Sequence, residues 1–173
     1  DDNVEIKDGI RVLKSISFDL DLSKGGMLIK YIENPTKEQC LEAVNQEGDS
    51  IEFIKNPSEE VIIAAVKQNG YSIYFVENPS EHVQLLAVRR HGNAIEYIDN
   101  PTEAVKLEAV KNGAPILFIR NPSDEIKIAA VEKQGNMILH ILNPSPELQI
   151  AAVKSDPSAI GYIHNPTEEA QLE

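Results

Sequence analysis

Apolar residues recur along the chain in two clusters that are separated by a glycine and introduced by an Asn-Pro pair. After the pair at residues 56–57, Val61 and Ala65 share one face of a predicted helix; Gly70 follows, and residues 73–76 form a shorter apolar cluster. The opening asparagine recurs at intervals of 22, 22, 22, 21, 22 and 22 residues, at Asn34, Asn56, Asn78, Asn100, Asn121, Asn143 and Asn165. A fixed period in this range predicts an all-α solenoid of two-helix repeats, whose units bury their apolar faces by stacking.

The pattern also predicts where each helix begins and ends. Asn56 is expected as the N-cap, with Pro57 at the first helical position and Glu59 at the third. The glycine about a dozen residues later, such as Gly70, is expected as a left-handed C-cap. Because Pro157 replaces that glycine in the sixth unit, we expect a different turn there.

The second apolar cluster of each unit is either a short helix or a strand. The spacing of Ile73 and Val76 places both on one helical face, which favours a short helix with 3₁₀ character. A strand would instead build a leucine-rich-repeat horseshoe. One unit departs from the others, because a residue is missing before Gly113 and Pro115 enters the second helix; a tighter turn and a change of superhelix angle are expected there.

Equivalent positions of successive units predict columns of core residues. The small alanine column should let neighbouring helices approach closely. The expected apolar columns are Leu41, Ile63, Leu85, Leu107, Ile128 and Ile150; Val44, Val66, Val88, Val110, Val131 and Val153; Ile51, Ile73, Ile95, Ile116, Ile138 and Ile160; and the aromatic column Tyr31, Phe53, Phe75, Tyr97, Phe118, His140 and Tyr162.

The periodicity divides the chain into two parts. Residues 1–25 lie outside the repeat and are expected to cap the core of the first unit, and residues 26–173 comprise a half unit, six full units and the start of a seventh. Residues 4–12 read as a small hairpin turning at Asp8-Gly9, and residues 15–22 alternate as a strand would, although an irregular helical cap is the alternative. The start without Met and the stop within a helix predict a trimmed or processed product; the partnerless last helix should fray.

Composition narrows the class of protein. The 173 residues are 42% hydrophobic and 25% charged, as expected for one soluble domain. The net charge of −12 argues against direct binding to nucleic-acid phosphates. A single cysteine, no apolar run long enough to cross a membrane and no visible signal peptide predict a cytoplasmic protein without a membrane contact.

The consensus Asn-Pro-[Ser/Thr]-Glu-x-Val-x-Leu-x-Ala-Val-Lys-x-x-Gly resembles short helical repeats of bacterial and phage proteins of unassigned function. It is also similar to the leucine-rich repeat variant family, whose units alternate an α-helix with a 3₁₀ helix. The resemblance covers residues 26–173, although the period here is shorter than in that family. It implies a binding scaffold, and the missing cysteine cluster implies no iron–sulfur centre.

Residues that carry chemistry do not form a catalytic or metal-binding motif in the sequence. Cys40 has no histidine in its own unit and is interpreted as a surface thiol, and the four histidines occupy different repeat positions. His140 replaces an aromatic residue and is interpreted as a packed side chain. We therefore predict a protein that is not an enzyme and that uses no cofactor or metal.

Candidate binding residues are those that differ between units at positions where the fold does not require a particular side chain. If these positions face outward, an apolar patch marks the C-terminal half, and Arg89 and Arg90 form the densest positive point. The predicted partner-binding residues are Tyr74, Leu117, Arg120, Leu139, Leu142, Arg89 and Arg90. Alternatively, Leu139 and Leu142 pack beneath a further unit or a second copy that associates through the C-terminal end.

Three functions are compatible with this pattern. The first is a non-enzymatic scaffold that binds another protein through variable side chains on an extended surface. The second is an acidic mimic of nucleic acid that inhibits a DNA- or RNA-binding protein, as phage or bacterial anti-defence proteins do, with Glu33, Glu52, Glu77, Glu96 and Asp99 on one side. The third is an enzyme whose active site lies outside this chain. Steep loss of affinity with salt would distinguish the mimic from an apolar contact.

Overall fold

The computed structural model describes residues 4–7, 10–13 and 21–173. Strands β1 (Val4–Lys7) and β2 (Ile10–Leu13) pair antiparallel, with Val4 opposite Leu13 and Lys7 opposite Ile10, so the two strands of the expected hairpin are confirmed. The expected turn at residues 8–9 and most of the expected strand over residues 15–22 lie outside the described residues.

From residue 22 onward the described chain alternates 3₁₀ helices with α-helices. The α-helices are α1 (Lys37–Gln46), α2 (Glu59–Gln68), α3 (Glu81–Arg90), α4 (Glu103–Lys111), α5 (Asp124–Lys133), α6 (Pro146–Ser155) and α7 (Glu168–Gln171). The 3₁₀ helices are η1 (Leu22–Lys24), η2 (Gly26–Tyr31), η3 (Gly48–Phe53), η4 (Gly70–Phe75), η5 (Gly92–Tyr97), η6 (Ile116–Phe118), η7 (Gly135–His140) and η8 (Pro157–Tyr162). The short second elements are therefore helices and not strands.

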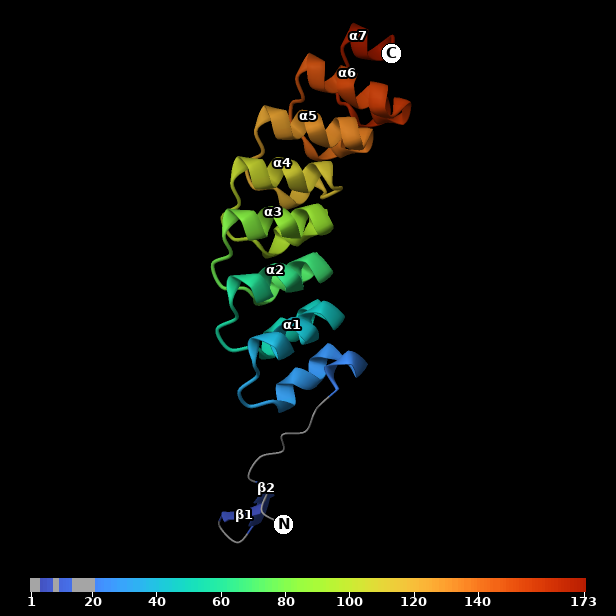
Figure 1. Cartoon of the computed structure of the whole chain (residues 1–173). Coiled ribbons are helices and arrows are strands. Elements are labelled where there is room, and N and C mark those ends of the chain that lie inside the picture. Colours follow the sequence, from blue (N-terminus) through green and yellow to red (C-terminus); the bar gives the residue numbers. More distant parts are fainter. Residues whose placement is uncertain (1–3, 8–9, 14–20) are drawn as a thin grey trace.

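Successive helices pack against one another in chain order. Each α-helix contacts the α-helix before it and the one after it, and each 3₁₀ helix contacts its neighbours in the same way (Figure 1). At the N-terminal end, η1 packs on η2 and α1, and its Leu22 is buried. Among the described residues, no helix has both the length and the apolar character needed to cross a membrane.

The residue that caps each α-helix is the Ser or Thr, which corrects the expectation for Asn. In α3, for example, Ser80 is the N-cap and accepts a hydrogen bond from the Val83 N–H, while Glu81 is the first helical residue. Asn78 lies two residues earlier at φ 49°, a left-handed conformation that asparagine tolerates. The Asn-Pro pair therefore forms the turn before the helix, and the N-cap hydroxyl accepts one free N–H in each α-helix except α2, where Ser58 makes no such bond.

Gly48, Gly70, Gly92 and Gly135 serve close packing and are not left-handed C-caps, which is a second correction; Gly113 does have the expected left-handed φ. A Cβ on Gly70 would lie 2.6 Å from the Ala87 carbonyl oxygen at the end of the next α-helix, and a Cβ on Gly48 would lie 2.6 Å from the Ala65 oxygen. A φ in the left-handed range is found at Gly113 alone among the described glycines. Each of the other glycines that starts a 3₁₀ helix thus lets the following pair of helices approach its backbone.

The two irregular turns differ from each other. At the end of α4, Gly113 has φ 91°, its N–H donates to Val110, and the Ala114 N–H donates to Ala109, so this turn does change as expected. Pro115 then precedes a shortened η6. The turn before Pro157 does not change, contrary to expectation, because its cap Asp156 has φ −148°, close to the −150° of Gln134 before η7.

The core consists of the alanine column and three apolar columns. Ala43, Val44 and their equivalents are buried, as expected, and so is the isoleucine column from Ile51 to Ile138. The aromatic column was expected in the core, but Tyr31 is 70% exposed and Tyr97 43%. The Leu41 column is only partly buried, and Ile128 within it is exposed. Residues that complete the core instead include Val61, Val83, Val105, Ile126 and Leu148.

Cys40 is also placed differently from its predicted position. Its side chain is buried in the cluster that contains Leu22 and Val44, so it is not a surface thiol. Burial raises the pKa of the Cys40 thiol, because the thiolate is poorly solvated there. The residue therefore acts as a small apolar side chain in the core.

Candidate functional site

The row of 3₁₀ helices exposes large side chains at a defined position. Ile73 of η4 is buried, and the cap residue Val76, three positions later, is partly buried, because a 3₁₀ helix has about three residues per turn. Tyr74, between them, points outward and is 65% exposed. Leu117 of η6 and Leu139 of η7 hold the corresponding position, and each is 59% exposed. The fold thus presents these side chains at equivalent positions of the row, with Leu117 and Leu139 on adjacent 3₁₀ helices.

The predicted residues fall into two places on the molecule. Tyr74, Leu117 and Leu139 lie in η4, η6 and η7, and Arg120 and Leu142 lie in the segments just after η6 and η7. Leu142 is 92% exposed. Arg89 and Arg90 instead end α3, and Arg89 donates to the Glu108 carboxylate at 3.0 Å. The structure therefore separates the arginine pair from the row of 3₁₀ helices.

An aromatic cluster, which the sequence did not predict, covers η4 and η5. The rings of Tyr74 and Tyr97 meet edge to face with centroids 5.3 Å apart. Tyr71 stacks on His91 at 4.6 Å and meets Tyr97 at 6.2 Å. His91 Nδ1 accepts the Gly70 N–H at 3.1 Å, which fixes the imidazole against η4. Tyr97 was assigned to the core, while Tyr71 stands out in the sequence because asparagine occupies the equivalent positions 93 and 136.

Carboxylates surround the exposed rings of this cluster. A groove of about 680 Å³ is lined by Tyr74 and Tyr97 together with Glu77, Glu96 and Asp99. All three acidic residues are exposed. The groove joins aromatic faces, which carry negative potential, with three negative charges, an arrangement that favours a cation. We call it the Tyr74–Tyr97 groove.

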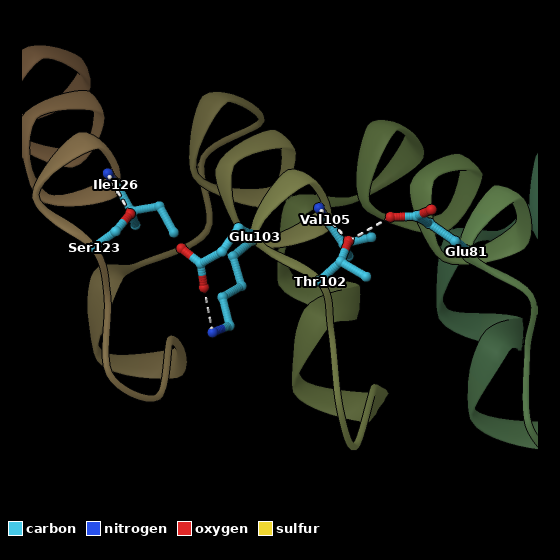
Figure 2. A network of polar contacts seen from close by, with 7 residues as sticks. Glu81, Thr102, Glu103, Val105, Ser123 and Ile126 are labelled. Carbon is cyan, nitrogen blue, oxygen red and sulfur yellow. Dashed lines mark hydrogen bonds and ion pairs between the residues drawn. The ribbon is translucent and has the colours of Figure 1, made fainter.

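A second polar network runs along the N-terminal ends of the α-helices (Figure 2). The Thr102 hydroxyl accepts from the Val105 N–H at 3.4 Å and donates to the Glu81 carboxylate of the preceding helix at 2.6 Å (Figure 2). Glu103 accepts from Lys106 at 2.7 Å. This bond, and a weaker one from Ser123 of α5, lower the pKa of Glu103. The network links α3, α4 and α5 and has a structural role.

Among the residues that the structure describes, no group of His, Cys, Asp and Glu side chains has the placement needed to hold a metal ion. The packing of the helices explains neither the charged and aromatic lining of the Tyr74–Tyr97 groove nor the exposure of Leu117, Leu139 and Leu142. Both lie on the row of 3₁₀ helices. They form the candidate functional surface.

The chain was compared with protein families, curated proteins and solved structures. No family of proteins, no curated protein and no solved structure matches this chain.

Proposed function

We propose that the chain is a solenoid of 22-residue units that acts as a non-enzymatic scaffold and binds another protein along its row of 3₁₀ helices. The spacing of the α-helix starts supports the solenoid, since residues 37, 59, 81, 103, 124, 146 and 168 begin them. Packing between sequential neighbours supports it as well. Such an assembly holds exposed side chains at regular intervals.

One observation carries the binding function. Tyr74, Leu117, Leu139 and Leu142 are 59% to 92% exposed, although the isoleucines that precede the first three, Ile73, Ile116 and Ile138, are buried. Large apolar side chains that gather on one surface are typical of interaction sites. Because they stand on a packed framework, little ordering would be needed on binding.

The test is affinity capture from extracts of the native cell, with the double variant Leu117→Asp and Leu139→Asp as the comparison. We expect the variant to retain its helical circular dichroism and to lose captured partners. A matched control adds two negative charges elsewhere through Ala104→Asp and Gln134→Glu, both at exposed positions. Glu47 already occupies the position equivalent to Gln134. Retention of every partner by the leucine variant would refute the proposed surface.

A second candidate function is the acidic mimic of nucleic acid. It is favoured by the convergence of Glu77, Glu96 and Asp99 on one groove and by the net charge of −12. A mimic should lose affinity for its partner steeply between low and moderate salt, because exposed charges are screened over about 10 Å at 0.1 M. A contact through Leu117 and Leu139 should change little over the same range. Salt titration of the captured complex separates the two functions.

A further inference from the structure

Grooves between successive 3₁₀ helices differ in the charges that line them. The groove between η2 and η3 is lined by Lys30, Lys37 and Lys55 as well as Glu33. The groove between η5 and η6 is lined by Lys106 and Arg120 as well as Glu96 and Asp99. In these two grooves the chain supplies its own cations opposite its carboxylates.

The Tyr74–Tyr97 groove shares Glu96 and Asp99 with the groove between η5 and η6, but Lys106 and Arg120 line only the latter. Among the described residues that line it, Glu77, Glu96 and Asp99 are charged and none is Lys or Arg. Glu77 and Asp99 occupy equivalent positions of adjacent pairs of helices. The same two positions hold Glu33 and Lys55 in the groove between η2 and η3, and Asp99 and Arg120 in the groove between η5 and η6. A like-charged pair thus stands where the other grooves have opposite charges, and a bound cation would relieve its repulsion.

The chain itself shows a cation on the equivalent surface. Lys30, the fifth residue of η2, holds the place that Tyr74 holds in η4. Its Nζ lies 5.0 Å from the Tyr31 ring centroid and 5.9 Å from that of Phe53, which is the counterpart of Tyr97. These are distances at which a cation is attracted to an aromatic face. At the Tyr74–Tyr97 groove the rings and acids are present, and the cation must come from another molecule.

One buried polar atom of a residue that lines this groove, the Gln84 Oε1, has no hydrogen-bond partner among the described residues. The Gln84 Nε2 donates to the Pro79 carbonyl at 2.9 Å. The equivalent Gln149 donates to Pro144 in the same way, but its Oε1 accepts the Thr167 N–H at 2.9 Å. The Gln84 Oε1 thus lacks the partner that Gln149 has, but it is buried, so the acceptors open to a ligand in this groove are the three exposed carboxylates.

We propose that the Tyr74–Tyr97 groove binds an arginine side chain of an extended segment of the partner protein. A planar guanidinium can stack on an exposed tyrosine ring while its N–H groups donate to several acceptors at once. A lysine ammonium is a compact, strongly hydrated charge and uses such a set of acceptors less fully. The proposal rests on the proposed scaffold function and names the chemistry of the side chain that the scaffold takes.

The test uses three blocked peptides, Ac-Gly-Gly-Arg-Gly-Gly-NH₂ and its lysine and citrulline counterparts, in ¹⁵N NMR titrations of the full chain. Citrulline keeps the shape of arginine without its charge. We expect the arginine peptide to shift amide resonances of η4, η5 and residues 76–79, and to bind more tightly than the lysine peptide. We expect no saturable shift with citrulline. Equal binding of either counterpart, or shifts elsewhere only, would overturn the proposal.

Variants can be drawn from residues that the chain already uses at equivalent positions, so that folding is preserved. Glu77→Lys copies Lys55 and places a cation in the groove; we expect at least a tenfold loss of affinity for the arginine peptide. Tyr74→Leu copies Leu139 and removes one ring; a loss of about three- to fivefold is expected from the usual strength of a cation–π contact. Glu132→Lys copies Lys154 on another face and should stay within twofold. Unchanged binding by the folded Glu77→Lys protein would refute the site.

The peptide titration tests the groove, and the affinity capture tests the leucine surface, so one proposal can fail while the other stands. If the arginine peptide does not bind while Leu117→Asp with Leu139→Asp still abolishes capture, the scaffold function stands and the groove assignment is wrong. If the peptide binds but capture does not depend on the leucines, the groove stands and the leucine surface is wrong. Tyr74 belongs to both surfaces, but the two experiments change different residues, so the two proposals can be judged separately.

Discussion

The glycine that begins most of the 3₁₀ helices has a role that can be tested by adding one methyl group. In Gly70→Ala the new Cβ would lie 2.6 Å from the Ala87 carbonyl oxygen and 3.1 Å from the Arg90 Cβ. Overpacking against backbone costs about 1–3 kcal/mol, and we expect Gly70→Ala near the upper end of that range. The free energy of unfolding in urea measures the loss.

Gly161→Ala is the matched control for this substitution. A Cβ there would meet no atom within 4 Å, and its φ is not in the left-handed range. We expect no loss of stability, or a gain of up to about 1 kcal/mol through the unfolded chain. Similar destabilisation of both variants would show that close packing is not the reason for the glycine at position 70.

The hydroxyl of Thr102 is expected to stabilise two helices at once. Thr102→Ala removes the N-cap bond to the Val105 N–H and the bond to Glu81 (Figure 2). A lost cap typically costs about 1 kcal/mol. Thr102→Ser keeps the hydroxyl and should restore most of the stability.

A double-mutant cycle between Thr102→Ala and Glu81→Ala isolates the contact between helices, because alanine at position 81 removes the acceptor. A coupling free energy clearly above zero, measured by urea unfolding, would support a link between α3 and α4. Additive effects would mean that the hydroxyl acts only as a cap.

At the scale of the element, carboxylates at the α-helix N-termini make the free energy of unfolding depend on pH. The pKa of Glu103 is held below its ordinary value of 4.5, first by the Lys106 hydrogen bond and then by Ser123. Backbone and hydroxyl hydrogen bonds lower the pKa of Glu38 and of Glu147 in the same setting. Because the folded-state pKa is below the unfolded one, the stabilisation is present above about pH 4.5 and is lost as the pH falls.

We therefore expect the free energy of unfolding to decrease between about pH 5 and pH 3, and Glu103→Gln to make this decrease smaller. Urea denaturation at a series of pH values measures the slope. Lys106→Met removes the largest cause of the Glu103 shift and should reduce the slope as well. An unchanged slope in both variants would contradict the assignment.

The sequence predicted that the second element of each unit is a short helix, but it did not predict that the aromatic column of that helix is largely exposed. The spacing from Ile73 to Val76 indicated a helix with three residues per turn, and both residues do face inward. The same geometry turns residues 74 and 75 away from the deepest layer, which explains why the aromatic column is largely exposed. The cap was misassigned because Asn78 and Ser80 are both good capping residues, and their backbone angles alone distinguish them.

At the scale of the whole molecule, the sequence predicted the position of each α-helix and the burial of the Val44 column, because both follow from periodicity. It predicted the exposure of Tyr74 and Leu139, since the fold does not need those side chains. The sequence did not predict that Tyr74, Tyr97 and Glu77 line one groove, because that prediction needs the distance between neighbouring 3₁₀ helices to be known. The contact of each glycine with the next alanine carbonyl was hidden for the same reason.

Packing between sequential neighbours leads to a prediction about the whole chain. Deleting residues 81–102 removes α3 and η5 and joins Ser80 to Glu103, which keeps an N-cap and its helix in register. If the chain is a solenoid, the shortened protein should remain folded and unfold with a smaller denaturant m-value, roughly in proportion to the surface removed. Deleting residues 81–91 alone removes an α-helix without its 3₁₀ partner, and this control should lose cooperative unfolding. Circular dichroism in urea checks both variants, and equal collapse of the two would mean that distant parts of the chain depend on one another.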